Sequence, residues 1–281
     1  DLDAGVGVTV FSHAESPYVY YILDNKDPLI GTSIHGARSL TADSPGCPAG
    51  CVSMAVHLDR LWFLTDSESG PSQVLYTDPL NLNSIRSGNS IQIDGHGVAI
   101  LPGQFGTLDN SLTPRLLIFT QTSIHVLDGD PQLGGGLQAD LRTLRVGLGL
   151  RSTHGACMTP YGAFFLGTDG DLWQIPPGTA SVDPVGGPIQ NALVWNNHTL
   201  VEDTPPNNAG SLAWYDPYLY IFPGGETGYA FVAEPSREGI KFWGPVTTKY
   251  GPRVGIIRTP VANFQWHSDD AQSVSIHSID A

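Results

Sequence analysis

Two cysteines four residues apart are the first candidates for chemistry in this sequence. Cys47 and Cys51 lie in the stretch Cys-Pro-Ala-Gly-Cys, and His57 is the nearest histidine on the C-terminal side. This spacing suits a local disulfide or one half of a metal site. A zinc site needs two more ligands, and the chain has three cysteines and no second cysteine pair. A disulfide, a zinc site and free thiols therefore remain open here.

A second candidate is the stretch Gly-Thr-Asp-Gly-Asp-Leu-Trp at residues 167–173, which places Asp169 and Asp171 around a glycine. Calcium loops of the EF-hand type offer carboxylates in this way, but they need ligands across twelve residues and a terminal Glu. That Glu is missing here. The Asp-Gly pair instead predicts a hairpin turn.

The remaining signatures of catalysis are missing from the sequence. Its nine histidines include no His-Glu-x-x-His, and the chain has no Gly-x-Ser-x-Gly and no phosphate loop. We expect His125 to point away from the apolar face of its strand and Cys157 to be a small buried hydrophobe. Most acidic residues fall in predicted turns. We therefore predict no catalytic, cofactor-binding or metal-binding residue, and no enzyme.

Several aromatic residues of the C-terminal half are candidates for a sugar-stacking surface. On strands, such side chains more often fill the space between sheets, so the pattern favours core packing. The residues are Trp195, Trp214, Tyr215, Tyr218 and Tyr220.

The composition indicates a β protein. Of 281 residues, 41 % are hydrophobic and 14 % charged, and the chain holds 33 Gly and 22 Pro. This balance suits short strands joined by turns. No sustained window has the periodicity of an amphipathic helix, and no apolar stretch approaches the roughly 20 residues that a membrane span needs.

The dominant pattern is a hairpin, an apolar run followed by a polar turn and a second strand. We identify six, with strands at residues 19–22 and 29–34, 61–64 and 73–76, 116–119 and 124–127, 163–166 and 172–175, 219–222 and 229–232, and 262–266 and 273–279.

The first five hairpins begin 42 to 56 residues apart, which is close to the length of a β-propeller blade. Ala55, Cys157 and Ala213 each lie six residues before an apolar run, where small side chains fit the crowded inner strand of a blade. Further strands are predicted at residues 90–93, 143–146 and 192–195. We predict an all-β, propeller-like fold with five or six four-stranded blades.

We expect residues 1–281 to form a single propeller domain, either whole or part of a longer chain. The N-terminal strand, residues 6–11, is predicted to close the ring with the last blade and hide the sheet edges. An irregular β-sandwich or two small barrels are the alternatives, because they also consist of short strands.

The formal net charge is −14, from 27 acidic and 13 basic residues. Phosphate-rich surfaces repel such a chain at long range. High-affinity binding to a nucleic-acid backbone is therefore not expected.

Three stretches resemble a known class of proteins: MAVHLDRLWFLTDSESGPSQVLYTDPLN, LLIFTQTSIHVLDGDP and HGACMTPYGAFFLGTDGDLWQI. They are similar to segments of virion structural proteins of tailed bacteriophages, namely β-propeller proteins of the tail nozzle, hub or packaged-DNA-stabilising type. The resemblance covers about residues 52–175.

This resemblance implies a structural role in the virion, in which several copies form a ring around the path of the genome. The implied partners are other copies of the chain and other tail or neck proteins, with DNA only in passage and no membrane. The alternatives are a receptor-binding or glycan-binding propeller on a particle or cell surface, and a propeller that hydrolyses glycosides with carboxylates near its axis.

Overall fold

The computed structural model describes the backbone of residues 7–13, 16–22, 29–32, 36–39, 51–65, 71–79, 85–106, 112–131, 140–190, 193, 210–223, 229–247, 253–258, 263–269 and 273–279. Side chains are described for residues 51–65, 71–79, 85–103, 114–131, 140–190, 193, 210–223 and 230–245. By its internal contacts, the chain divides into two compact units. The first consists of residues 5–104 and 113–149, and the second of residues 1–4, 105–112 and 150–281.

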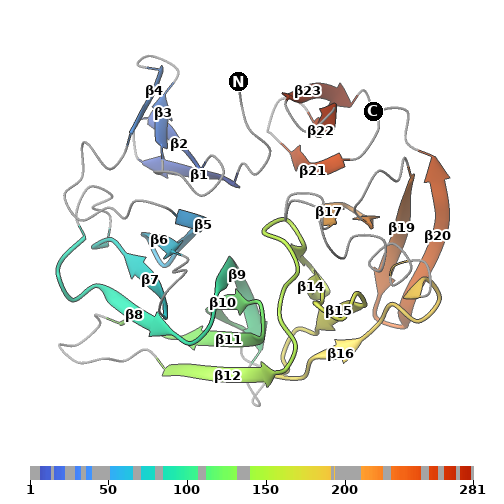
Figure 1. The fold of residues 1–281 in the computed structure, drawn as a ribbon, viewed down its shortest axis with the longest axis horizontal. Coiled ribbons are helices and arrows are strands. Elements are labelled where there is room, and N and C mark those ends of the chain that lie inside the picture. The colour runs from blue at the N-terminus through green and yellow to red at the C-terminus, as the bar shows by residue number, and fades with distance from the viewer. Residues whose placement is uncertain are drawn as a thin grey trace. The chain divides into compact units, whose positions relative to one another are not determined.

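In the first unit, the described strands form three antiparallel sheets. They are β1 (Gly7–His13), β2 (Ser16–Ile22), β3 (Leu29–Thr32) and β4 (Gly36–Ser39); β5 (Cys51–His57), β6 (Arg60–Thr65), β7 (Ser72–Tyr76) and β8 (Ser90–Ile93); and β9 (Gly97–Gly106), β10 (Leu112–Thr120), β11 (Ser123–Asp128) and β12 (Asp140–Val146). Within each sheet the strands lie side by side in chain order (Figure 1).

The second unit repeats this arrangement. Its described strands are β13 (Ala156–Thr159), β14 (Gly162–Leu166), β15 (Leu172–Ile175) and β16 (Asp183–Pro184); β17 (Ser211–Tyr215), β18 (Tyr218–Phe222), β19 (Tyr229–Ser236) and β20 (Gly239–Thr247); and β21 (Arg253–Arg258), β22 (Asn263–Asp269) and β23 (Ser273–Ile279). As far as the strands are described, the last sheet has three members and the others have four.

All six predicted hairpins are confirmed, and each supplies the second and third strands of one sheet. The hairpin between β14 and β15 turns at the predicted Asp-Gly pair, where Gly170 has a φ of 86°. That backbone conformation is easy for glycine and costly for most other residues.

The small residues Ala55, Cys157 and Ala213 lie in β5, β13 and β17, the first strand of three sheets. Each pairs with the residue seven positions later on the next strand, namely Trp62, Phe164 and Tyr220. The three sheets therefore share one register between their first two strands.

Two strand predictions need correction. The N-terminal strand β1 does not pair with the last sheet but with β2, where Gly7 lies opposite Ile22. Residues 192–195 were expected to form a fourth strand, but that position is taken by β16. Leu193 is helical, since its amide donates to the Ile189 carbonyl over 3.0 Å, and both side chains pack in a core. The rest of that segment lies outside the described residues.

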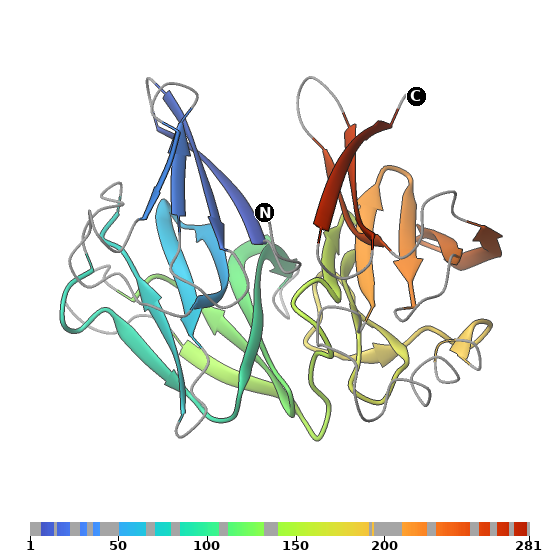
Figure 2. The same cartoon turned by 45° about the horizontal axis from the view of Figure 1, so that its top comes forward.

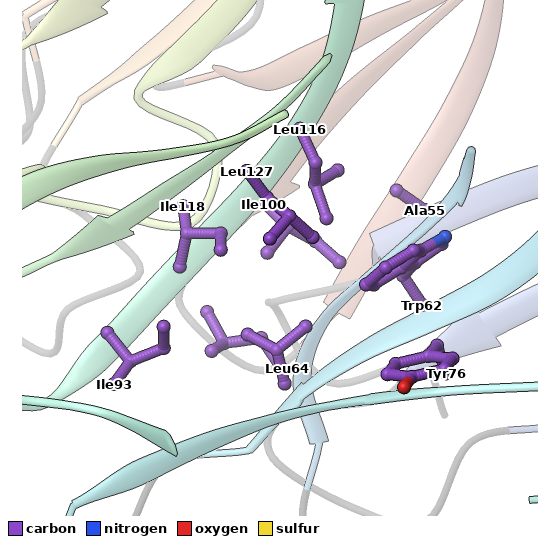
Figure 3. Close-up of a cluster of buried hydrophobic side chains, with 10 residues drawn as sticks. Ala55, Trp62, Leu64, Tyr76, Ile93, Ile100, Leu116, Ile118 and Leu127 are labelled. Atoms are coloured by element: carbon purple, nitrogen blue, oxygen red, sulfur yellow. The ribbon is translucent and has the colours of Figure 1, made fainter. Parts of the chain in front are cut away.

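Buried apolar side chains join neighbouring sheets within each unit. In the first unit, Trp62, Leu64 and Val74 of the β5–β8 sheet form one cluster with Leu116 and Ile118 of β10. Figure 3 shows Trp62 beside Tyr76 in this cluster, and Figure 2 shows the cyan strands of the β5–β8 sheet beside the green strands of the β9–β12 sheet. Each sheet thus buries a face that it does not cover alone.

A second cluster joins the β13–β16 and β17–β20 sheets of the other unit. Its buried members include Phe164 and Leu172 from the first of these sheets and Leu219, Ile221 and Phe231 from the second. Burial of such side chains stabilises a fold by about 1.5 to 3 kcal/mol each.

Candidate functional site

The most buried charged group among the described residues is Arg60, at the first position of β6, with 1 % of its surface exposed. Its Nη2 donates to both carboxylate oxygens of Asp130, over 2.9 and 3.2 Å, and its Nη1 donates to the Thr77 carbonyl over 2.8 Å. Asp130 follows β11, in the neighbouring sheet. A buried guanidinium is tolerated only when it is paired and hydrogen-bonded in this way. The ion pair therefore ties two adjacent sheets together.

Aromatic rings surround this ion pair. The Arg60 guanidinium lies 5.7 Å from the centre of the Tyr76 ring, and Trp62 lies 4.8 Å from Tyr76 between ring centres. Trp62 Nε1 donates to the His57 carbonyl over 2.9 Å, and the His57 ring meets the Trp62 ring edge-on at 5.9 Å. Burial lowers the pKa of His57 to about 4, and the Asp130 carboxylate partly offsets this effect. His57 is therefore a neutral residue of the core near pH 7.

A second buried arginine, Arg115, precedes the apolar run of β10 as Arg60 precedes that of β6. The two stretches are Arg-Leu-Trp-Phe-Leu-Thr at residues 60–65 and Arg-Leu-Leu-Ile-Phe-Thr at residues 115–120. Arg115 Nη2 binds the Asp128 carboxylate of its own sheet over 2.8 Å, and Arg142 of β12 binds the same carboxylate over 2.9 Å. The sequence reasoning missed both arginines, although this repeated stretch was the signal that marks them.

The hairpin between β10 and β11 holds a chain of hydroxyl and imidazole groups that the sequence reasoning also missed. The Ser123 hydroxyl lies 2.7 Å from His125 Nε2 and 2.8 Å from the Thr120 hydroxyl, and His125 Nδ1 lies 3.1 Å from the Thr143 hydroxyl. A serine close to an imidazole is the arrangement of an activated nucleophile. Ser123 and His125 are both buried, however, and each polar side-chain atom has its partner within the sheet. In this structure, these contacts stabilise the turn between β10 and β11.

His125 lies on the face of β11 opposite to that of Ile124 and Val126, as expected, but this face is apolar too. His125 lies opposite Ile118, which belongs to the apolar cluster of the first unit. The side chains of β11 are buried on both faces of the sheet, so the strand has no polar face. Burial lowers the pKa of His125, and Asp94 opposes this effect.

Asp169 and Asp171 serve the turn that they were predicted to form. Asp169 Oδ1 accepts the Asp171 amide over 3.1 Å and the Trp173 indole NH over 3.0 Å. Asp171 is buried, and its Oδ1 accepts the Leu172 amide over 2.8 Å. Burial raises the pKa of Asp171, and the charge of Asp169 adds to this effect. Within the described ranges, no three His, Cys, Asp or Glu side chains come together as metal ligands would.

Two of the three cysteines, Cys51 and Cys157, lie in the described part of the chain. Cys51 is buried at the start of β5, whereas Cys47 lies outside the described residues, so the three alternatives for this pair are not tested. Cys157 packs against the core of the second unit, and burial raises the pKa of its thiol to about 12. A thiol with so high a pKa is a weak nucleophile at neutral pH.

The predicted aromatic residues divide between core and surface. Trp214 packs against the core of the second unit and meets the Tyr161 ring edge-on at 6.3 Å, and Tyr220 is partly buried. Tyr218 is exposed and contacts Trp243, a residue that the sequence reasoning did not single out. Trp195 lies outside the described residues. No helix in the described part of the chain is long and apolar enough to cross a membrane.

Comparisons with known proteins identify the fold. No family model matches the sequence, and no curated protein matches it. Among solved structures, the soluble aldose sugar dehydrogenase from Escherichia coli aligns with a TM-score of 0.53 at 11 % identity, covering 99 % of this chain and 96 % of that one. A glucose dehydrogenase gives 0.52 at 10 % identity, with 99 % and 98 % covered. The BBS1N structure in complex with ARL6DN gives 0.51 at 10 % identity, with 95 % and 77 % covered.

These neighbours are β-propellers, so the prediction of an all-β, propeller-like fold is confirmed. The prediction that the chain is not an enzyme must be corrected, because its structural neighbours include sugar dehydrogenases. At this identity the likeness shows the fold alone, and one fold hosts many functions. The prediction relied on missing sequence motifs, whereas catalytic residues are recognised by their geometry in the fold and not by their sequence position.

Proposed function

We propose that this chain is a structural component of a tailed-bacteriophage virion, a tail nozzle, hub or neck protein that forms part of a ring around the DNA path. The observation that carries the proposal is the resemblance of three sequence stretches to such proteins. These stretches fall on β5–β7, β10–β11 and β13–β15, which belong to three different sheets. The likeness thus extends over several blades and exceeds a single hairpin motif.

The buried ion pair between Arg60 and Asp130 supports a mechanical role. It joins two sheets whose strands come from residues 51–93 and 97–146, in addition to the apolar side chains packed between them. Breaking such a pair leaves a buried charge without its counter-ion or exposes it to water, and this costs free energy. A connection of this kind resists the separation of neighbouring blades.

The acidic balance supports passage of DNA without binding. With a formal net charge of −14, copies of the chain around a channel repel the phosphate backbone over about a Debye length of 8 to 10 Å. The duplex would be kept away from the wall and free to slide. The proposed partners are other copies of the chain and further tail or neck proteins, and the proposed location is the virion.

Immunogold labelling of tailed particles tests the proposal, using antibodies raised against the purified chain and particles from the source that encodes it. We expect label on the axis of the tail or neck. Light scattering after gel filtration should show several copies associated in the presence of the neighbouring tail protein. Particles without label would overturn the proposal, and label on peripheral spikes would favour a receptor-binding protein instead.

A further inference from the structure

Two aromatic side chains at the end of the β17–β20 sheet are exposed and contact one another. Trp243 of β20 is 44 % exposed and Tyr218 of β18 is 37 % exposed. Their ring centres lie 6.0 Å apart and their planes are inclined by 85°. The two rings, here called the aromatic corner, therefore stand nearly perpendicular to each other, as two walls of a corner do.

Strand register explains why these rings meet. Tyr220 lies opposite Val232, and Val232 lies opposite Trp243, so these three side chains share one face of the sheet. Tyr218, two residues before Tyr220, belongs to the same face. β20 is the last strand in the order of its sheet, as Figure 1 shows. The corner thus joins Tyr218 of β18 to Trp243 of the terminal strand β20, across β19.

Both faces of the sheet bury apolar side chains. On the face of the corner, Ala213, Phe222 and Ala230 are buried and Tyr220 packs against them. The opposite face holds the larger cluster. Leu219, Ile221 and Phe231 are buried there, and Phe242, the neighbour of Trp243 in sequence, packs against them. The buried clusters on the two faces of the sheet therefore form without Tyr218 and Trp243. Exposure of Trp243 and Tyr218 calls for another explanation.

Polar groups border the corner. Glu234 of β19 lies opposite Lys241 of β20, one side-chain row further along the face of Trp243. Tyr215 lies opposite Tyr218 across the turn that joins β17 to β18. The surface thus combines two open aromatic rings with phenol hydroxyls and a cross-strand pair of opposite charges. The exposed Asp216 lies in the turn between Tyr215 and Tyr218, so the border is slightly acidic.

We propose that the aromatic corner binds a neutral carbohydrate, with one sugar ring stacked on the indole of Trp243 and its hydroxyl groups directed to Glu234 and Lys241. The carbon–hydrogen face of a sugar suits an open aromatic ring, and its hydroxyls suit the polar border. This inference does not depend on the proposed virion role.

The size of the corner favours a sugar over a protein. The exposed large hydrophobic residues in the described part of the chain are Val146, Tyr218 and Trp243, and Val146 belongs to the other unit. Two side chains fall far short of the roughly 800 Å² per partner that a stable protein interface buries. One or two sugar rings match this area.

Charge disfavours the other ligands that stack on aromatic rings. Single-stranded nucleic acids stack their bases on such side chains, but they also need a positive groove for the backbone. Here Lys241 is the basic residue in the row beside Trp243, and Glu234 lies directly opposite it. The formal net charge of −14 likewise opposes phosphorylated or sulfated glycans.

The test is a titration of the purified full chain with maltoheptaose, cellohexaose and chitohexaose, in which binding is measured by tryptophan fluorescence and by calorimetry. A neutral glycan array is probed with the same protein. We expect at least one of these sugars to bind and to change the fluorescence. Trp243→Ala should weaken that binding about tenfold or more, with a smaller loss for Trp243→Phe, which keeps a ring. Raising the salt concentration should leave the affinity unchanged.

Val146→Ala is the matched control, because it removes an exposed hydrophobic side chain from the other unit. It should bind sugar as the unchanged chain does. Thermal melting of each variant verifies that it is folded, and Tyr218→Ala provides a second test if Trp243→Ala is not. Sugar binding that survives both Trp243→Ala and Tyr218→Ala, or no binding in the titrations and on the array, overturns the proposal. Neither result bears on the place of the chain in a virion.

Discussion

At the scale of single residues, the structure is distinguished by ionisable side chains inside its core. The Nε2 atom of His57 is buried and has no hydrogen-bond partner in the described structure, and burial lowers the pKa of this histidine to about 4. Arg60 is buried in the same region and forms an ion pair with Asp130 over 2.9 Å. The folded state therefore requires a neutral His57 and an Arg60 that stays paired with Asp130.

We predict that His57 makes the protein sensitive to acid. An unfolded chain has a histidine pKa near 6.5, so between pH 6.5 and 4 the unfolded state takes up the proton and the folded state does not. Stability is therefore lost as the pH falls through this range, by about 3 kcal/mol in total. Urea unfolding of the unchanged chain and of His57→Phe at pH 7 and pH 4.5 measures this. Equal losses in the two proteins would contradict it.

We predict that the Arg60–Asp130 pair behaves as a unit. Arg60→Met should cost about 3 to 5 kcal/mol, because it removes the guanidinium that forms an ion pair with a largely buried carboxylate. The double variant Arg60→Met, Asp130→Leu should be more stable than Arg60→Met alone. Denaturant unfolding of the four proteins of this cycle gives the coupling energy.

The control for this cycle is Arg142→Met, which removes ion pairs to Asp140 and Asp128 from an arginine whose side chain is half exposed. Asp128 keeps its ion pair with Arg115 in this variant. Exposed pairs contribute at most about 1 kcal/mol, so its effect should be small. Similar losses for Arg60→Met and Arg142→Met would show that burial does not strengthen the dependence on the Arg60 pair.

At the scale of strands and turns, the fold depends on short connections with special backbone geometry. Leu58 and Asp59 join β5 to β6 with φ values of 48° and 57°, which are unusual for residues other than glycine. Gly162, at the start of β14, has a φ of 112°, and an added Cβ would lie 2.2 Å from the Ile175 carbonyl oxygen. The backbone of β15 thus approaches so closely that only glycine fits.

We predict that Gly162→Ala is strongly destabilising, by about 3 kcal/mol or more, because it combines a positive φ with a collision against backbone. Gly187→Ala is the matched control, since an added Cβ there would meet nothing within 4 Å. It should change stability by less than about 1 kcal/mol. Thermal melting of the two variants compares them, and equal melting temperatures would refute the argument.

Sequence patterns predicted the hairpins because their information is local. Alternating or continuous apolar runs beside a turn such as Asp169-Gly170 determine a strand pair within about 15 residues. The partner of β1 was predicted wrongly, since an alternating strand does not specify which sheet edge it joins. The helical residue Leu193 was mistaken for part of a strand because a short apolar run is compatible with either element.

The polar groups were harder to predict than the strands. Arg60 and Asp130 are 70 residues apart, and only the packing of two sheets brings them together. The contact between Tyr218 and Trp243 likewise depends on the register of three successive strands. Residue types alone identified Tyr218 as a candidate for sugar stacking, but not its exposure or its neighbour.

At the scale of the whole molecule, stability comes from repetition. Each four-stranded sheet exposes apolar faces that it cannot cover alone, and neighbouring sheets cover them within each unit. Because one fold of this kind serves both enzymes and binding proteins, the overall architecture constrains function less than surface and charge do. The acidic balance of the chain is one such property.

We predict that the protein does not bind double-stranded DNA at low salt. Its 27 acidic residues against 13 basic ones should prevent the release of counterions that drives such binding. A gel-shift assay at 50 mM salt with up to 10 μM protein, both chosen for the assay, should leave the duplex unshifted. A salt-sensitive complex would contradict both this prediction and the proposed sliding of DNA along the wall.

The bond from Arg60 to Asp130 also determines how the first unit should come apart. The guanidinium of Arg60 on β6 binds the carboxylate of Asp130, which follows β11. If either strand unfolded alone, the ion pair would break and a charged group would remain in the other sheet. Deuterium uptake by the backbone amides of these two strands should therefore occur in one concerted opening. In Arg60→Met the two strands should exchange independently, each at its own rate.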